Sequence, residues 1–123
     1  MTGSQIRYLL TISVLVKERG AVRSADVADA LGVSKPSVTV ALRKLEEERL
    51  VCREERGSLI LTEAGKALCE RYARCAACIE AFLKRELCSS PNAAKYDALE
   101  ILGCLSEQNF KNLCKRLQEK SED

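Results

Sequence analysis

The chain contains no histidine among its 123 residues, and only 4% of them are aromatic. Imidazole is the usual general base near neutral pH and the commonest metal ligand in proteins. Its absence excludes Ser-His-Asp and Cys-His catalysis and every zinc or haem site that needs a histidine ligand. A pair of catalytic carboxylates would need a cleft that so short a chain rarely supplies. We therefore expect that the protein is not an enzyme.

A long hydrophobic run is missing as well. The apolar stretch 9–16 is broken by Thr11 and Ser13 and is followed by three charged residues. It predicts neither an export signal nor a membrane span. The seven cysteines are an odd number, which favours a pool of reduced thiols over a disulfide framework. These features predict a cytoplasmic protein with no membrane partner.

The residues that are present predict a mainly α-helical fold. The composition is 46% hydrophobic, with 20 Lys+Arg against 18 Asp+Glu, and a chain of this size can form a core without disulfides or a structural metal. Apolar residues at three- and four-residue spacing predict helices at 4–19, 24–31, 35–49, 63–87, 91–105 and after 106. Two short strands, 50–53 and 59–62, are predicted around a Gly-Ser turn. Ser24, Ser34 and Ser106 are the expected helix N-caps.

The order of these elements indicates DNA binding. A helix, a three-residue turn, a second helix and a hairpin with glycine at its tip form the pattern of a winged helix-turn-helix, whose second helix enters the DNA major groove. In the predicted second helix, Val38, Leu42 and Leu45 recur on one side. The other side is small, polar and basic, and no acidic residue occurs between Ala30 and Leu45.

The predicted DNA-binding residues lie on this helix and on the hairpin. Hydroxyl groups can bond phosphates or base edges, apolar groups can contact a thymine methyl, and basic groups neutralise phosphates. The predicted residues are Ser34, Lys35, Pro36, Ser37, Thr39, Val40, Arg43 and Lys44 on the helix, with Arg53 and Arg56 on the hairpin. The alternative is a solvated helix face in a winged-helix protein-interaction module, because residues 1–62 carry a net charge of only +2, ten basic against eight acidic.

The long helix predicted at 63–87 carries a seam that requires a partner helix. Its apolar residues step by four, three, four and three, which is the spacing of a helix–helix contact. The residues of this predicted dimer interface are Leu68, Tyr72, Cys75, Ile79 and Phe82. We therefore expect a DNA-binding domain at 1–62 and a helical dimerisation domain at 63–123.

Three segments resemble a known family. Residues 25–39 (ADVADALGVSKPSVT), 45–51 (LEEERLV) and 61–65 (LTEAG), followed by a long helix, resemble the diphtheria-toxin-repressor and manganese-transport-regulator family of winged-helix repressors. The resemblance covers nearly the whole chain. It implies a homodimer that binds a palindromic operator in double-stranded DNA and represses genes of metal uptake, with manganese or iron as cofactor.

The metal ligands of that family have no counterpart in this sequence. The family takes ligands from the start of the first helix, from a histidine on the long helix and from a carboxylate-rich set on the next helix. The corresponding segments here are 7–10 (RYLL), 75–76 (CA) and 99–104 (LEILGC), so no metal site is predicted at the family positions and the cofactor is left unknown.

Thiolates offer a substitute for those ligands. Cys75, Cys78 and Cys104 could form a soft-metal or redox sensor. The alternative is that they are small apolar fillers, since free cysteine packs like a hydrophobic residue. Cys69, Cys88 and Cys114 have no evident partner in the sequence.

Overall fold

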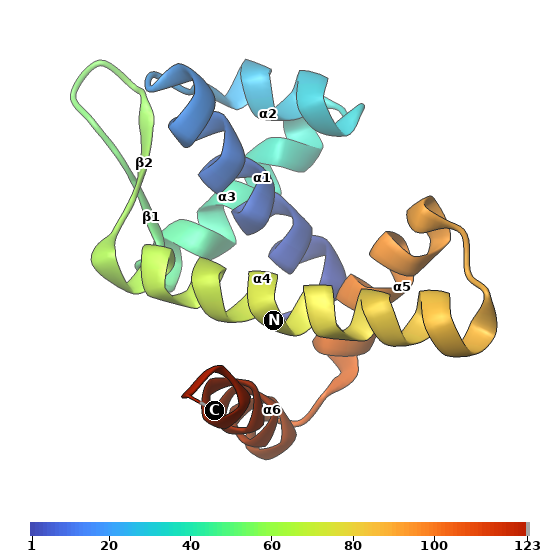
Figure 1. The fold of residues 1–123 in the computed structure, drawn as a ribbon. Coiled ribbons are helices and arrows are strands. Elements are labelled where there is room, and N and C mark those ends of the chain that lie inside the picture. Colours follow the sequence, from blue (N-terminus) through green and yellow to red (C-terminus); the bar gives the residue numbers. More distant parts are fainter. Residues whose placement is uncertain (123) are drawn as a thin grey trace. The chain divides into compact units, whose positions relative to one another are not determined.

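The computed structural model describes residues 1–122, with the side chains of residues 1–120. Its elements are α1 (Gly3–Arg19), α2 (Ser24–Leu31), α3 (Lys35–Glu47), β1 (Val51–Arg53), β2 (Leu59–Leu61), α4 (Glu63–Leu87), α5 (Pro91–Cys104) and α6 (Glu107–Glu122) (Figure 1). This order confirms the predicted mainly α-helical fold with a two-stranded wing. The chain divides into two compact units, Arg7–Cys69 and Met1–Ile6 together with the chain from Glu70 onward.

The unit Arg7–Cys69 is organised around one apolar core. The fully buried side chains come from α1, the segment before α2, both helices of the helix-turn-helix and the wing: Leu9, Ile12, Val22, Val27, Val38, Leu42, Leu45, Val51 and Leu59. The apolar side of α3 therefore faces the core, as its spacing predicts, and the helix-turn-helix is held by burial rather than by helix propensity.

The start of α2 differs from the sequence-based prediction. The N-cap is Arg23 rather than Ser24, so the prediction for Ser24 is wrong. The carboxylate of Asp26 accepts a hydrogen bond from the Arg23 N–H at 2.8 Å and pairs with Arg19 at 3.1 Å. Because an acidic side chain in the first turn satisfies the free amide, no hydroxyl is needed there. The Ser24 hydroxyl is left to contact the wing instead.

The turn between α2 and α3 follows the predicted chemistry. Gly32 ends α2 in the left-handed conformation, with φ 64°, where glycine has no Cβ to clash. Ser34 caps α3 by accepting the Ser37 N–H at 3.3 Å. The helix ends at Glu47, two residues earlier than predicted, because Arg49 adopts φ 58° and the Leu50 N–H closes back on the Leu45 carbonyl at 3.0 Å.

The wing is a short antiparallel hairpin. Val51 lies opposite Leu61 and Arg53 lies opposite Leu59. Gly57, at φ 86°, makes the tip. The strands are one residue shorter than the predicted 50–53 and 59–62, because Leu50 and Thr62 have a different role.

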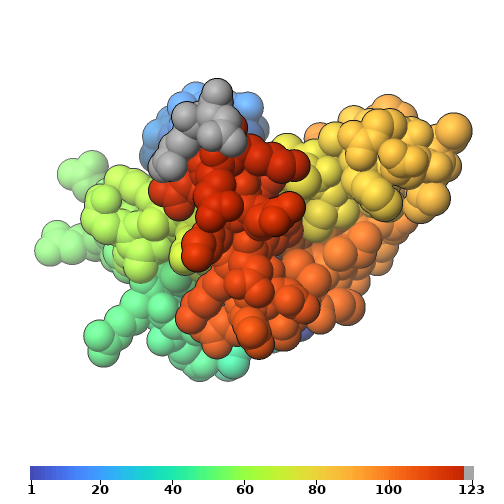
Figure 2. Space-filling model, turned by 60° about the horizontal axis from the view of Figure 1, so that its bottom comes forward, coloured from blue at the N-terminus to red at the C-terminus, as the bar shows by residue number. Residues whose placement is uncertain are grey.

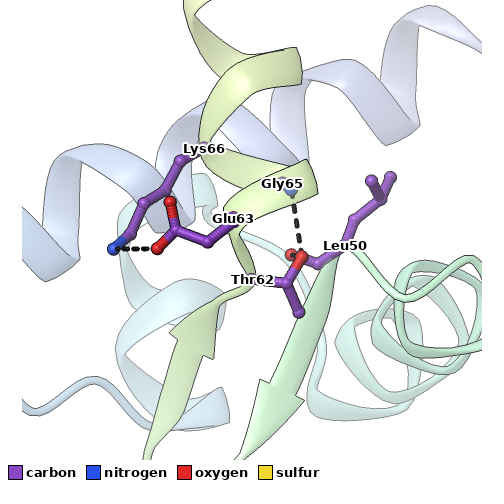
Figure 3. Close-up of polar contacts among 5 residues, drawn as sticks. All are labelled: Leu50, Thr62, Glu63, Gly65 and Lys66. Atoms are coloured by element: carbon purple, nitrogen blue, oxygen red, sulfur yellow. Dashed lines mark hydrogen bonds and ion pairs between the residues drawn. The ribbon is translucent and has the colours of Figure 1, made fainter.

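Leu50 and Thr62 join the wing to α4 (Figure 3). The Thr62 hydroxyl donates to the Arg49 carbonyl at 2.7 Å and accepts the Gly65 N–H at 3.0 Å, so it caps α4 while holding the end of the α3 segment. A Cβ on Gly65 would overlap the Leu50 carbonyl oxygen. Gly65 is therefore needed for close approach, not for an unusual φ.

The second unit is held by close helix contacts. Ser90 caps α5, as the Ala93 N–H donates to its hydroxyl at 3.2 Å, and Ser106 caps α6 in the same way. At the N-terminus of α1, a Cβ on Gly3 would lie 2.9 Å from the Leu99 carbonyl oxygen, and one on Gly103 would overlap the Gly3 nitrogen. These two glycines let the start of α1 and α5 pack backbone against backbone.

Candidate nucleic-acid interface

One exposed surface of α3 gathers most of the predicted DNA-binding residues. We call it the α3 face, and it consists of Lys35, Pro36, Ser37, Thr39, Val40, Arg43 and Lys44, all exposed, with Ser34 exposed at its start. Val40 is 68% exposed although it is apolar. An apolar side chain among polar and basic ones suits contact with a thymine methyl next to phosphates.

The charges of the α3 face are not neutralised internally. Within the described residues, no ion pair or hydrogen bond engages the charged groups of Lys35, Arg43 or Lys44. Of the acidic residues that follow, Glu46 is paired with Arg53 at 3.2 Å. Among the side chains that the structure describes, the three cations of the α3 face thus have no partner, which is what phosphate binding requires.

The hydroxyl groups of this surface are positioned by short local bonds. The Ser34 and Ser37 hydroxyl oxygens lie 2.9 Å apart, and the Thr39 hydroxyl donates to the Lys35 carbonyl at 3.1 Å. The Thr39 oxygen, which only donates in this arrangement, keeps two lone pairs that can accept from a base or from water. These bonds hold the hydroxyls in place before any partner arrives.

The two arginines predicted on the wing have different surroundings. Arg56 is exposed near the tip. Arg53 instead donates from Nε to Glu46 at 3.2 Å and from Nη2 to the Ser24 hydroxyl at 3.1 Å, although it is still 40% exposed. Arg53 thus links α2, α3 and β1, and this role was not apparent from the sequence.

The predicted dimer seam on α4 is covered in part by the same chain. Tyr72 stacks on Phe110 of α6, with ring centroids 4.7 Å apart and an interplanar angle of 26°. Cys75 is fully buried and also contacts α6. Leu68 and Ile79 are partly exposed, and Phe82 is 50% exposed. The homodimer itself stays a prediction.

The cysteines are arranged differently from the predicted sensor. Within residues 1–122 no group of three metal-binding side chains is found, and Cys78 and Cys104 are both exposed. The sulfur that contacts Cys75 is that of Cys114 on α6, at 3.6 Å. The expectation that Cys114 lacks a partner is therefore wrong.

The residue spacing along the two helices is compatible with the Cys75–Cys114 contact but does not select it. Phe110 and Cys114 are four residues apart on one helix side, as Tyr72 and Cys75 are three apart on another. Burial, and secondarily the neighbouring thiol of Cys114, raises the pKa of Cys75 from 9.0 to about 12. The Cys75 thiol is thus neutral at physiological pH.

Comparison with known proteins shows which family this chain resembles. Residues 2–59 match the model of the iron-dependent repressor N-terminal DNA-binding domain. The HTH-type transcriptional regulator MntR of Geobacillus thermodenitrificans is 34% identical over 83 residues, which are 68% of this chain and 59% of that protein. The chain is therefore similar to the winged-helix regulators of the diphtheria-toxin-repressor and manganese-transport-regulator family.

Solved structures of this family have the same fold. The manganese regulator SloR superposes with a TM-score of 0.76 at 28% identity, over 96% of this chain and 55% of that one. A hypothetical protein from Sulfolobus solfataricus matches with a TM-score of 0.70 over 97% of this chain and 91% of its own, at 20% identity, which shows the fold alone. The chain therefore spans somewhat more than half the length of the MntR and SloR proteins that it matches.

The metal site of the family does not fit the residues found here. Arg7 places a permanently charged guanidinium, with Nη2 shielded from solvent, where a cation would need an anionic ligand. On α5, Leu99 and Leu102 are buried apolar side chains, and Gly103 packs against Gly3. The segment 99–104 keeps one carboxylate, Glu100, and one thiol, Cys104, but within residues 1–122 no group of three metal-binding side chains is found. The described residues therefore do not fit the family's manganese or iron site.

Two other findings bear on the class of protein. Three of the matched curated relatives are each named as an HTH-type transcriptional regulator. Within residues 1–122, no helix is both long and apolar enough to cross a membrane.

Proposed function

We propose that this protein is a cytoplasmic transcriptional repressor that binds double-stranded DNA as a homodimer. In this proposal α3 enters the major groove, Arg56 on the wing contacts an adjacent phosphate or the minor groove, and two chains read a palindromic operator. The observation that carries the proposal is the α3 face on the second helix of a helix-turn-helix. There, three cations without a partner among the described residues flank an exposed valine and hydrogen-bonded hydroxyls.

The dimer in this proposal depends on the helical part of the chain. Residues 1–62 form the DNA-binding domain and residues 63–123 the dimerisation domain. Exposed apolar side chains in the helical part support this assignment: Phe82, Leu87, Tyr96 and Ile101, each 39% to 66% exposed. Covering such side chains is what a second chain would contribute. Two-fold symmetry of the protein then accounts for a palindromic site.

Control by manganese or iron at the family positions is not part of the proposal. Within residues 1–122, Arg7 and the segment 99–104 do not supply the group of three ligands that such a site needs.

The first test is a salt titration of DNA binding with two matched triple variants. K35A/R43A/K44A removes the cations of the α3 face, and K111A/K115A/R116A removes the same number and types of charge from exposed positions of α6. Affinity for a fluorescent random-sequence duplex is measured by anisotropy, since phosphate neutralisation does not depend on sequence. We expect the first variant to lower the slope of log K against log salt by about 2.7, at 0.9 per phosphate contact. The second should leave it unchanged.

Two outcomes would contradict the proposal. A flat salt slope for the unmodified protein would favour a protein-interaction module, and equal losses in both variants would assign binding to overall charge. The dimer is tested by sedimentation of the protein with a duplex selected for binding from the random-sequence DNA. A complex of one protein chain with one duplex would overturn the homodimer.

A further inference from the structure

A pair of thiols lies between α4 and α6, in a place that the DNA-binding proposal does not use. Cys75 and Cys114 are 39 residues apart in the chain, and their sulfur atoms are 3.6 Å apart. Cys75 is fully buried and Cys114 is partly exposed. We propose that Cys75 and Cys114 are a redox-active pair that forms a reversible disulfide and so locks α6 onto α4.

The contacts around the pair hold the two helices in the required arrangement. The Tyr72–Phe110 stack lies about one helical turn before the thiols on both helices, and Arg71 contributes its guanidinium carbon 6.0 Å from the Phe110 ring centre. A disulfide brings its sulfur atoms to about 2.05 Å. Closing from 3.6 Å needs a shift of about 1.5 Å, which side-chain rotation with a small helix movement can supply.

The surroundings of the two thiols assign them different roles. Cys114 is the one that solvent reaches, and Figure 2 shows α6, in red, at the surface of the molecule. Cys75 is shielded from solvent, and its raised pKa keeps the thiol protonated until it reacts with the oxidised Cys114. The nearby thiol of Cys78 also raises the pKa of Cys75, whereas Arg74 lowers it. An oxidant therefore meets Cys114 first, and Cys75 is the resolving cysteine.

The oxidant in this proposal is hydrogen peroxide. The Cys114 thiol loses its proton, its sulfur attacks one peroxide oxygen, and the O–O bond breaks to give a sulfenic acid and hydroxide. The hydroxide takes up the Cys114 proton and leaves as the first water. The Cys75 sulfur then attacks the Cys114 sulfur, the S–O bond breaks, and the Cys75 proton leaves with the departing hydroxide as water. Two thiols and one peroxide thus give one disulfide and two waters, and the two sulfurs supply the two electrons. A small dithiol reductant reverses the reaction.

Neither of the other two cysteines from the predicted sensor replaces Cys114 in this role. Cys78 lies one helical turn after Cys75 on the same helix, and Cys104 is exposed on α5. Within the described residues, neither sulfur forms a hydrogen-bond contact with Cys75 as Cys114 does. Both serve as controls.

Peptide mapping of the full-length reduced protein after peroxide treatment tests the pair. Trypsin leaves Cys75 on peptide 75–84 and Cys114 on peptide 112–115. We expect these peptides to be linked, with the loss of about 2 Da that accompanies one disulfide. Dithiothreitol should separate them. Because peptide 75–84 also contains Cys78, the C78S variant should keep the link, as C104S and C88S should. C75S and C114S should both lose it.

The locking effect has a separate readout. A disulfide across this loop constrains the unfolded chain, so oxidation should raise the melting temperature by roughly 5–10 °C, and should not do so in C114S. Persistence of the linked peptides in C75S, or over-oxidation of Cys114 to sulfinic acid with Cys75 left as a thiol, would overturn the pair. An unchanged melting temperature of the linked protein would overturn the lock. The wild-type mapping decides the matter even if a cysteine variant fails to fold.

Discussion

The helix-turn-helix and the α4–α6 contact hold their chemically active side chains by different means. On the α3 face the polar groups are exposed and are positioned by bonds that span three or four residues, such as Ser34–Ser37 and Thr39–Lys35. Between α4 and α6, the thiol of Cys75 is fully buried and meets its partner across 39 residues of chain. The first arrangement depends on local geometry and the second on tertiary packing. Mutation and pH should therefore change the stability of the two regions differently.

The largest effect is expected where tertiary packing enters the DNA-binding part of the chain. In the variant G65A, the new Cβ would overlap the Leu50 carbonyl oxygen. The Thr62 hydroxyl bonds to the backbone on both sides of this contact, so neither segment can move away freely. We expect the free energy of unfolding to fall by about 3 kcal/mol, measured by urea denaturation.

The control for G65A is A64G on the neighbouring exposed position. Losing a helix former near the helix start should cost less than about 1 kcal/mol. Equal losses in the two variants would mean that the close approach to Leu50 contributes nothing.

The buried thiol makes the stability of the protein sensitive to alkaline pH. The pKa of Cys75 is raised from 9.0 to about 12 by burial and by Cys114, so between these values the unfolded chain has lost a proton that the folded chain keeps. The stabilisation is therefore complete below pH 9 and falls as pH rises, by up to about 1.4 kcal/mol per pH unit. Denaturation of reduced protein should show a steeper alkaline decline for wild type than for C75A.

Cys88 is the reference for the pH experiment because its thiol is exposed. C88S should retain the wild-type dependence of stability on pH. If C75A also retains it, burial of the Cys75 thiol has no energetic consequence for folding.

A smaller effect separates the two arginines of the wing. R53A removes the contacts with Glu46 and Ser24 and should lower the free energy of unfolding by about 1 kcal/mol, since the group is partly exposed. R56A should change stability by less than about 0.5 kcal/mol, but should weaken DNA binding about 3–10-fold and lower the salt slope by about 0.9. Thermal denaturation and anisotropy together measure both. If R56A lowered stability and R53A weakened DNA binding instead, Arg56 would be the structural residue and Arg53 the DNA-binding one.

The smallest expected effect concerns the end of α4. Cys88 follows the helix with φ 52°, a left-handed conformation that a side chain disfavours. C88G should relieve this strain, but glycine also has a greater entropy in the unfolded chain, which opposes the gain. The net result should be a rise of about 0.5 kcal/mol in the free energy of unfolding. C88A keeps the Cβ and should gain nothing. A gain in C88A equal to that in C88G would show that the thiol, not the backbone, was unfavourable.

Local rules predicted most of the fold and the composition of the α3 face. Apolar spacing placed the helices to within about two residues, and the caps at Ser34 and Ser106 are confirmed. The prediction failed for the cap at Ser24, because two side chains can satisfy the same amide and the sequence alone does not rank them. The carboxylate of Asp26 serves there instead.

The sequence by itself determined the helix order, the wing and the sidedness of α3, because periodicity and capping act over a few residues. Only the tertiary structure decided that Cys75 meets Cys114 and not Cys104, that Arg53 joins three elements, and that Gly65 approaches Leu50. These contacts join residues 7 to 39 positions apart in the chain. Their partners are chosen by how whole helices and strands pack, which local spacing does not specify.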